Sequence, residues 1–535
     1  MRIRPSSPRN RRSIAAALAL PLSAALVASL AVPAGAAPAP SESKNSKTKL
    51  DPAIRSSLRA VPTIEGPIPQ NNSSYAYNTM KKAKQPYDVA TKGYVEEEFF
   101  LSGTANVYDL KDGKVVVATK AVPYVNRILV RRPADRAKSS GVVLLDIYNA
   151  SNGFDVEDHW RRLGDHTMAN GDTYIGVTSK PINVDALKNF DPKRYAKLTW
   201  NLSGKPDPNR KPLIADPKNP TAFNPHQSIP GTEEGLAWDI ITQTGNALRA
   251  NPKQLLGGQK TSTLLLIGQS QSGIYLNTWT NHFHSLVAKA RGKNLFDGYL
   301  NSVGARNERP IRQDGKGLAM VPASDAHDFD VPFITVTAEG DYTLFPPGTI
   351  TAEKTPKNRR HWQVVGTPHT DLLSKEIMAD AEILRSGRLP RVMDQAFIDA
   401  LNPYPLEPAI IAAKSALVKW HEKGVPAAPS RAFAQKDGKL ERDSLGNALG
   451  GLRYGLIDLP LATYQGASAP GSVFGSWKPI SLADFTKRYG TREAYIAQLR
   501  KANRASIKAG YLTTDGAAQM EAVARKAMDR IGVDW

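Results

Sequence analysis

The sequence predicts an α/β fold in which a mostly parallel central sheet is flanked by helices. After Ser140, short apolar runs such as 141–146 alternate with amphipathic stretches such as 233–248, a pattern typical of parallel strands covered on both faces. Before Ser140, β-rich runs are separated by glycine and aspartate turns, which indicates antiparallel strands at the start of the domain. These two observations assign the fold class.

The individual elements follow from run length and residue type. Antiparallel strands are expected at 98–101, 114–117 and 126–130. Further buried strands, each four to six residues of mainly apolar and β-branched type, are expected at 173–177, 263–267, 298–303, 332–337 and 362–365. Amphipathic spacing predicts helices over 233–248 and 274–289.

Residues 1–36 have the three parts of a signal peptide. Five arginines and no acid occupy 1–12, an apolar run covers 14–32, and Ala34-Gly35-Ala36 offers the small-x-small pattern that signal peptidase cleaves. We expect cleavage after Ala36 and a secreted protein. Arg11-Arg12 fits a twin-arginine signal and equally the basic start of a general secretory signal, so the export route stays open.

The rest of the chain divides by composition. Residues 37–92 are rich in Pro, Ser, Asn and Lys, which predicts a disordered or extended N-terminal segment, with order beginning near Gly93. We expect 93–535 to form one domain, in which 372–535 is a cap or C-terminal elaboration.

Composition excludes several classes of function. The chain has no cysteine, which excludes disulfides, thiolate nucleophiles and cysteine-ligated metals. Its net charge is +20, but the Lys and Arg residues are scattered and form no nucleic-acid motif, so we expect no nucleic-acid partner. Weak association with acidic cell-wall or polysaccharide surfaces is compatible with this charge. Beyond the signal peptide, no apolar run approaches the roughly 18 residues that span a bilayer.

The segment 263–274 reads as a strand, a sharp turn and the start of a helix. This is the context of the G-x-S-x-G nucleophile elbow of the α/β-hydrolase fold. In that turn, the residue two places before the serine and the residue two places after it are both small. Gly268 and Ser272 are both small, which selects Ser270 as the nucleophile. With Ser272 as nucleophile, the β-branched Ile274 would occupy the small position.

An acid and a base follow in the chain order that this fold uses. The strand 332–337 leads into Glu339 and Asp341, and a carboxylate in such a loop can orient an imidazole. Turn chemistry favours Asp341, which follows a glycine, and leaves Glu339 as the alternative acid. A last strand leads through Gly366-Thr367-Pro368 to His369, the expected general base.

The charge on a tetrahedral intermediate needs two backbone donors. The residue after the nucleophile supplies one of them, here Gln271. The loop after the strand 142–146 is expected to supply the other, from Asn149 or Ala150.

Metal binding is not predicted. His282 and His284 are two residues apart on a predicted helix and so cannot share an ion on one face. The aspartates around His327 lack the spacing of a calcium loop. We therefore expect no metal and no organic cofactor.

Taken together, these residues resemble a family of secreted bacterial and fungal α/β-hydrolase domain proteins. The matching stretches are spread over most of the chain, at 141–155, 174–181, 268–273, 362–371 and 446–453. The resemblance implies a serine hydrolase acting on carboxylic esters and points to Ser270 and His369. At the acid position the family has Glu followed two residues later by Asp or Glu, which leaves both Glu339 and Asp341 open.

The expected function is hydrolysis of small-molecule or polymer-linked esters through an acyl-enzyme intermediate. Ser270 would attack the carbonyl, His369 would carry the proton, and Asp341 would hold His369 in its working tautomer. Two alternatives remain open: an amidase or peptidase with the same triad, and a non-catalytic binding protein on the same fold.

Overall fold

The computed structural model describes residues 49–313, 320–322, 329–345, 356–371, 377–391 and 393–534. Within these residues, a sheet of nine strands runs in the order β1-β2-β3-β5-β4-β6-β7-β10-β11. Its strands are β1 (Thr63–Glu65), β2 (Tyr94–Lys111), β3 (Lys114–Pro133), β4 (Val142–Ile147), β5 (Thr173–Val177), β6 (Thr263–Gln269), β7 (Gly298–Ser302), β10 (Phe333–Ala338) and β11 (Arg359–Val364). β1, β2, β3 and β5 pair antiparallel, and every pair from β5 to β11 is parallel. The predicted fold class is confirmed.

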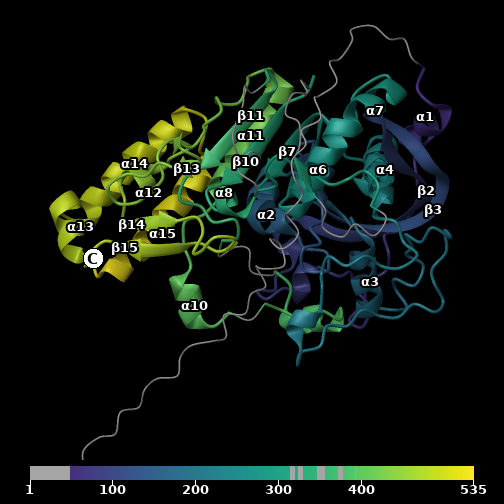
Figure 1. The fold of residues 1–535 in the computed structure, drawn as a ribbon, viewed down its shortest axis with the longest axis horizontal. Coiled ribbons are helices and arrows are strands. Elements are labelled where there is room, and N and C mark those ends of the chain that lie inside the picture. Colours follow the sequence, from purple (N-terminus) through teal and green to yellow (C-terminus); the bar gives the residue numbers. More distant parts are fainter. Residues whose placement is uncertain are drawn as a thin grey trace, which may run out of the picture.

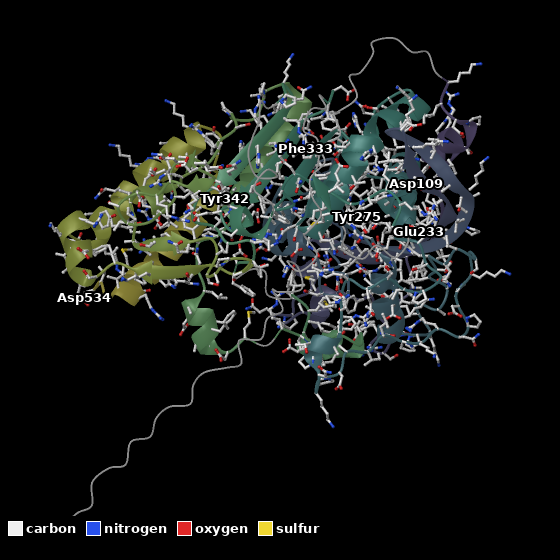
Figure 2. The ribbon with its side chains drawn as sticks, in the orientation of Figure 1. Asp109, Glu233, Tyr275, Phe333, Tyr342 and Asp534 are labelled. Atoms are coloured by element: carbon white, nitrogen blue, oxygen red, sulfur yellow. The ribbon has the colours of Figure 1, made fainter. Side chains whose placement is uncertain are left out.

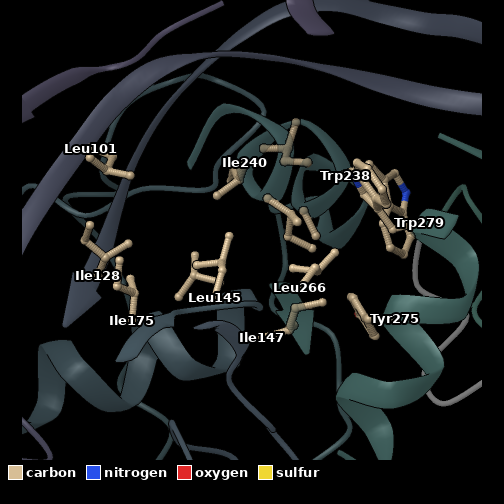
Figure 3. Packing of buried hydrophobic residues seen from close by; sticks show 14 of the residues in the cluster. Leu101, Ile128, Leu145, Ile147, Ile175, Trp238, Ile240, Leu266, Tyr275 and Trp279 are labelled. Atoms are coloured by element: carbon tan, nitrogen blue, oxygen red, sulfur yellow. The ribbon is translucent and has the colours of Figure 1, made fainter. Parts of the chain in front are cut away.

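Helices cover both faces of the sheet because alternate residues of the buried strands point to opposite sides. Leu145 and Leu266 belong to a hydrophobic cluster with residues of α4 and α6 (Figure 3). Their neighbours Leu144 and Leu265 belong to a second cluster with residues of α2 and α11. The helices of these two layers are α2 (Asp158–Asn170), α4 (Ala237–Ala250), α6 (Gln271–His282) and α11 (Glu407–Lys423).

The antiparallel part is simpler than predicted. The expected strands 114–117 and 126–130 are parts of one long strand, β3, which forms a hairpin with β2. Asp112 and Gly113 connect the two strands with φ values of 50° and 71°. Positive φ at both central residues is what a tight hairpin turn requires, and Asp-Gly adopts it readily.

The prediction of a disordered or extended segment over 37–92 is wrong for its described part. Helix α1 (Pro52–Arg59) buries Ile54 and Leu58, and β1 pairs with β2. Ile54 and Leu58 are four residues apart and therefore lie on one face of the helix, which packs against α4 and α7 (His284–Arg291). Two apolar residues among many polar ones give a weak sequence signal, and only the tertiary contacts order this helix.

The C-terminal region adds helices beside β11, where they extend the molecule to one side (Figure 1). Trp362 and Val364 of β11 share the second cluster with residues such as Leu456 and Met528, so the region is continuous with the core. Its elements are α9 (Asp380–Arg385), α10 (Gln395–Ala400), β12 (Gln435–Lys436), β13 (Lys439–Leu440), α12 (Gly455–Asp458), β14 (Ala462–Gln465), β15 (Ser476–Pro479), α13 (Leu482–Tyr489), α14 (Arg492–Lys508) and α15 (Thr514–Ile531).

Shorter elements complete the described chain. They are α3 (Pro181–Phe190), α5 (Pro252–Leu255), α8 (Asp341–Leu344), β8 (Asn307–Glu308), β9 (Val321–Pro322) and the 3-10 turns η2 (Met80–Lys82), η3 (Val89–Lys92), η4 (Arg136–Lys138), η5 (Pro220–Ala222) and η6 (Glu234–Leu236). Among the described residues, no helix combines the length and the hydropathy needed to cross a bilayer.

Candidate active site

Ser270 lies at a strained turn between β6 and α6. Its φ is 54° and its ψ is −119°, a conformation that costs free energy for any residue other than glycine. Gly268 makes this turn possible, since a Cβ at its position would lie 2.4 Å from the carbonyl oxygen of Ser272. The amide of Ser270 donates to the carbonyl of Ser302 at 2.8 Å, which fixes the turn to β7.

Ser272 has a structural place in the same turn. Its hydroxyl accepts a hydrogen bond from the amide of Gln269 and donates to the carbonyl of Gln269, both at 2.9 Å. The side chain is buried, whereas Ser270 is partly exposed. A serine can therefore replace the second glycine of the usual pattern because its hydroxyl closes the turn.

His369 and Asp341 extend in line from Ser270. The Oγ of Ser270 is 2.9 Å from Nε2 of His369, and Nδ1 of His369 is 2.6 Å from Oδ1 of Asp341. The edge of the Phe345 ring packs against the imidazole, with 5.9 Å between centroids. Each of the three residues follows the carboxyl end of a parallel strand, β6, β11 or β10, so the sheet itself brings them together.

The two candidate acids have different partners. Asp341 is fully buried, and its second oxygen accepts the amide of Ala338 at 2.9 Å. Burial raises the pKa of Asp341, and the neighbouring His369 opposes that rise. Glu339 instead accepts the amide of Gly366 at 2.8 Å and pairs with Arg442 at 3.0 Å. Of the two carboxylates, only Asp341 is hydrogen-bonded to His369.

The loop after β4 lies against the first residue of α6. The amide of Ala150 donates to Oε1 of Gln271 at 3.2 Å, and the side-chain amide of Asn149 donates to the carbonyl of Gln269 at 3.0 Å. The backbone amide of Asn149 is already bonded to the carbonyl of Val156. Of the two residues predicted to donate a backbone amide from this loop, Asn149 and Ala150, only Ala150 therefore remains a candidate. The amide of Gln271 belongs to the first helical turn, where no intrahelical acceptor exists.

A second Ser–His–Asp arrangement, which the sequence analysis did not identify, lies beneath the first. Nε2 of His159 is 3.1 Å from Oγ of Ser302, and its Nδ1 is 2.9 Å from Oδ1 of Asp146. The hydroxyl of Tyr174 donates to the other Asp146 oxygen at 2.7 Å. Ser302 and His159 have no exposed surface, so no substrate can reach this serine. The arrangement instead supports the backbone that holds Ser270.

The sequence analysis also missed a buried group of charged residues near α6. Lys180, Glu234 and Arg309 lie around Tyr275, which is one helical turn after Gln271. Lys180 closely follows the carboxyl end of β5, the edge at which sites of α/β sheets form. The place of Lys180 just after this strand was therefore the feature of the sequence that could have pointed to the cluster.

The histidines considered for metal binding have carboxylate partners. Nε2 of His282 lies 2.6 Å from Glu308, and Nε2 of His284 lies 3.0 Å from Asp330. Asp325, His327 and Asp328 lie outside the described residues. Within the described ranges, no three His, Asp or Glu side chains gather in a geometry that could hold a metal ion.

Comparison with solved structures gives distant similarity. The esterase Est22 is 15% identical, with 39% of this chain and 44% of that chain covered and a TM-score of 0.21. A rice cell wall degrading esterase LipA from Xanthomonas oryzae is 13% identical, with 40% and 44% covered and a TM-score of 0.21. A putative dienelactone hydrolase from Klebsiella pneumoniae subsp. pneumoniae is 11% identical, with 54% and 95% covered and a TM-score of 0.27. The match to Est22 thus spans less than half of that chain.

No curated protein matches the sequence. Residues 64–522 match the family described as alpha/beta hydrolase domain, and this range includes the whole central sheet except part of β1. The chain therefore belongs to the alpha/beta hydrolase domain family.

Proposed function

We propose that this protein hydrolyses carboxylic esters through an acyl-enzyme intermediate on Ser270. The observation that carries the proposal is the hydrogen-bonded line Ser270–His369–Asp341 at the ends of three parallel strands. A serine on a strained strand-to-helix turn, with a base at hydrogen-bond distance and an acid behind the base, is the arrangement that activates a hydroxyl for acyl transfer.

Proton transfer follows from the order of the contacts. As Oγ of Ser270 attacks the ester carbonyl, Nε2 of His369 takes its proton and later delivers it to the leaving alcohol. Asp341 accepts a hydrogen bond from the Nδ1–H of His369, which keeps Nε2 available as an acceptor and stabilises the imidazolium. Water then attacks the acyl-enzyme by the same route and releases the acid.

The negative charge of the tetrahedral intermediate would be held by two backbone amides. Gln271 offers the first, and its amide lies at the N-terminal end of α6, where the helix dipole also favours negative charge. Ala150 offers the second. Its amide is bonded to the Gln271 side chain, so that side chain must turn aside when substrate binds.

Labelling with a fluorophosphonate probe tests this mechanism. The probe should attach to Ser270, as located by mass spectrometry of the labelled peptide, and Ser270→Ala should neither react nor hydrolyse esters. Ser302→Ala is the matched control, because it removes another serine that contacts a histidine with an aspartate behind it. Labelling that survives in Ser270→Ala would refute the assignment. Comparing an ester and an amide of the same acyl group decides between esterase and amidase activity.

We also propose that the protein is exported. The basic start, the apolar run and Ala34-Gly35-Ala36 support removal of residues 1–36 during secretion. Expression of the full chain should give extracellular protein whose first residue is Ala37, as read by N-terminal sequencing. Replacing Arg11-Arg12 by two lysines should block export on the twin-arginine route and leave the general secretory route working.

A further inference from the structure

The side chain of Gln271 bridges two loops beside the nucleophile. Gln271 directly follows Ser270, begins α6 and is 4% exposed. Its Oε1 accepts the amide of Ala150 at 3.2 Å, and its Nε2 is 3.2 Å from Nδ1 of His226. Ala150 lies in the loop after β4, and His226 lies in the connection between α3 and α4. Tyr275, four residues further along α6, lies in the interior of the molecule (Figure 2). One buried carboxamide thus joins two separate loops to the nucleophile turn.

The donor and acceptor roles along this bridge have one solution. A backbone amide can only donate, so the atom of Gln271 that faces Ala150 must be the carbonyl oxygen. The NH2 group therefore faces His226, and Nδ1 of that ring must accept. Burial, with the positive charges of Lys180 and Arg309, lowers the pKa of His226 to about 3. The ring is therefore neutral near pH 7, with its proton on Nε2, and can serve as this acceptor.

The carboxamide oxygen of Gln271 uses the hydrogen that a substrate oxygen needs. The backbone amide of Ala150 is the candidate for the second donor to the tetrahedral intermediate, and it has a single hydrogen. In the free protein this hydrogen is bonded to the side-chain carbonyl oxygen of Gln271, the same kind of atom as the carbonyl oxygen of an ester. Substrate binding must therefore break the bond between Gln271 and Ala150. His226 opposes this movement, because it accepts from the other end of the planar carboxamide.

We propose that the carboxamide of Gln271, held in place by His226, competes with the substrate carbonyl for the amide of Ala150 and so weakens ester binding. The inference rests on the proposed ester hydrolysis and names the group that limits substrate affinity at the same site. The competing explanation is that the bridge only ties the two loops to α6. Losing a structural tie impairs the site, whereas losing a competitor improves substrate binding. The two explanations therefore predict opposite changes.

The substitution Gln271→Met separates these explanations. Methionine is about as long as glutamine but has no carbonyl oxygen, so the amide of Ala150 is left for the substrate. Because the competing bond exists only in the free protein, the change should appear in KM rather than in kcat. KM for 4-nitrophenyl acetate, an uncharged ester, should fall about 2- to 10-fold, the range expected for the net contribution of one hydrogen bond. A KM equal to that of the wild-type protein, or above it, would overturn the proposal.

Gln269→Met is the matched control, because it removes the same chemical group from the same turn. Gln269 directly precedes Ser270 and is 3% exposed. Its Oε1 accepts from Nε of Arg162 at 3.0 Å and does not take the hydrogen of Ala150. Gln269→Met should therefore not lower KM. An equal fall of KM in Gln269→Met and Gln271→Met would show a general loosening of the turn and would contradict the competition.

A double-mutant cycle tests whether His226 acts through Gln271. Leucine at position 226 cannot accept from the NH2 group of Gln271, so the carboxamide is held less firmly. His226→Leu should therefore lower KM, by less than Gln271→Met does. Added to Gln271→Met, it should lower KM no further, since its effect passes through the side chain already removed. A fully additive fall in the double variant would show that His226 acts on the substrate by another route, which would refute its proposed role.

The rate of fluorophosphonate labelling distinguishes a failed competitor from a failed mechanism. The phosphoryl oxygen of the probe needs the same backbone donors as an ester carbonyl. At low probe concentration, Ser270 should therefore be labelled about 2- to 10-fold faster in Gln271→Met than in the wild-type protein. If the wild-type protein is labelled at Ser270 and Gln271→Met is no faster, the competitor falls and the proposed function stands. If Ser270 is not labelled in the wild-type protein, the proposed function falls and the competitor falls with it.

Discussion

Replacing Asp341 by asparagine should almost abolish hydrolysis while the protein stays folded. The carboxylate accepts two hydrogen bonds, one from the amide of Ala338 and one from Nδ1 of His369. An asparagine can keep the first bond with its oxygen, which turns its NH2 group toward His369. The imidazole must then accept at Nδ1, so its proton moves to Nε2, the atom that faces Ser270.

The size of the effect follows from this change of tautomer. A base that already carries a proton on Nε2 cannot take one from Ser270, and such a change lowers kcat on the order of ten-thousandfold in serine proteases. This corresponds to about 5 kcal/mol of activation free energy. The assay is kcat for a simple ester, with the thermal midpoint measured to show that Asp341→Asn remains folded.

Glu339→Gln is the control for this prediction. Glutamine can still accept the amide of Gly366, and the ion pair that it loses is with Arg442, whose side chain is 35% exposed. Solvent screens such a partner, so hydrolysis should change by less than about fivefold. If Glu339→Gln were inactive and Asp341→Asn active, Glu339 would be the triad acid and the reasoning from hydrogen bonds would be refuted.

Three further predictions concern the turn, the N-terminal helix and metal dependence. Gly268→Ala places a Cβ 2.4 Å from the Ser272 carbonyl, so the free energy of unfolding in urea should fall by about 3 kcal/mol, and an unchanged midpoint would contradict the close approach. Asp239 of α4 accepts a hydrogen bond from the hydroxyl of Ser57 in helix α1. Burial raises the pKa of Asp239 from 3.8 to about 6, so the contribution of this group to stability should be full below pH 4 and fall by about 3 kcal/mol as pH rises through 6. Urea titrations across this range should lack that fall in Asp239→Asn. Extended EDTA treatment should leave ester hydrolysis unchanged, since the proposed mechanism uses no Lewis acid, and recovery of lost activity by added calcium would indicate an ion site near Asp330.

The fold class could be predicted because its signal is local. A buried parallel strand must be apolar along its whole length, so runs such as 263–267 are visible in the sequence. The elbow was visible for a related reason, since the strained backbone at Ser270 needs small residues at fixed positions around it. Helix α1 could not be predicted, because Ile54 and Leu58 stabilise a helix only through contacts with distant residues.

The site itself was predicted in part. Ser270 and His369 follow strand ends in the expected chain order, which left the choice between Glu339 and Asp341 to turn chemistry. Only the tertiary structure distinguishes the two carboxylates, because Asp341 contacts His369 and Glu339 contacts Arg442.

The sequence by itself determined the strands of the parallel sheet, the strand-turn-helix at Ser270 and the likeness to hydrolases, because each is written in neighbouring residues. The tertiary structure alone decided which carboxylate reaches His369, which loop amide lies beside Gln271, and that Lys180 and Arg309 meet at one carboxylate. Those pairings join residues from separate crossovers of the sheet. Their distances are set by how the strands pack together, and the order of residues along the chain does not encode them locally.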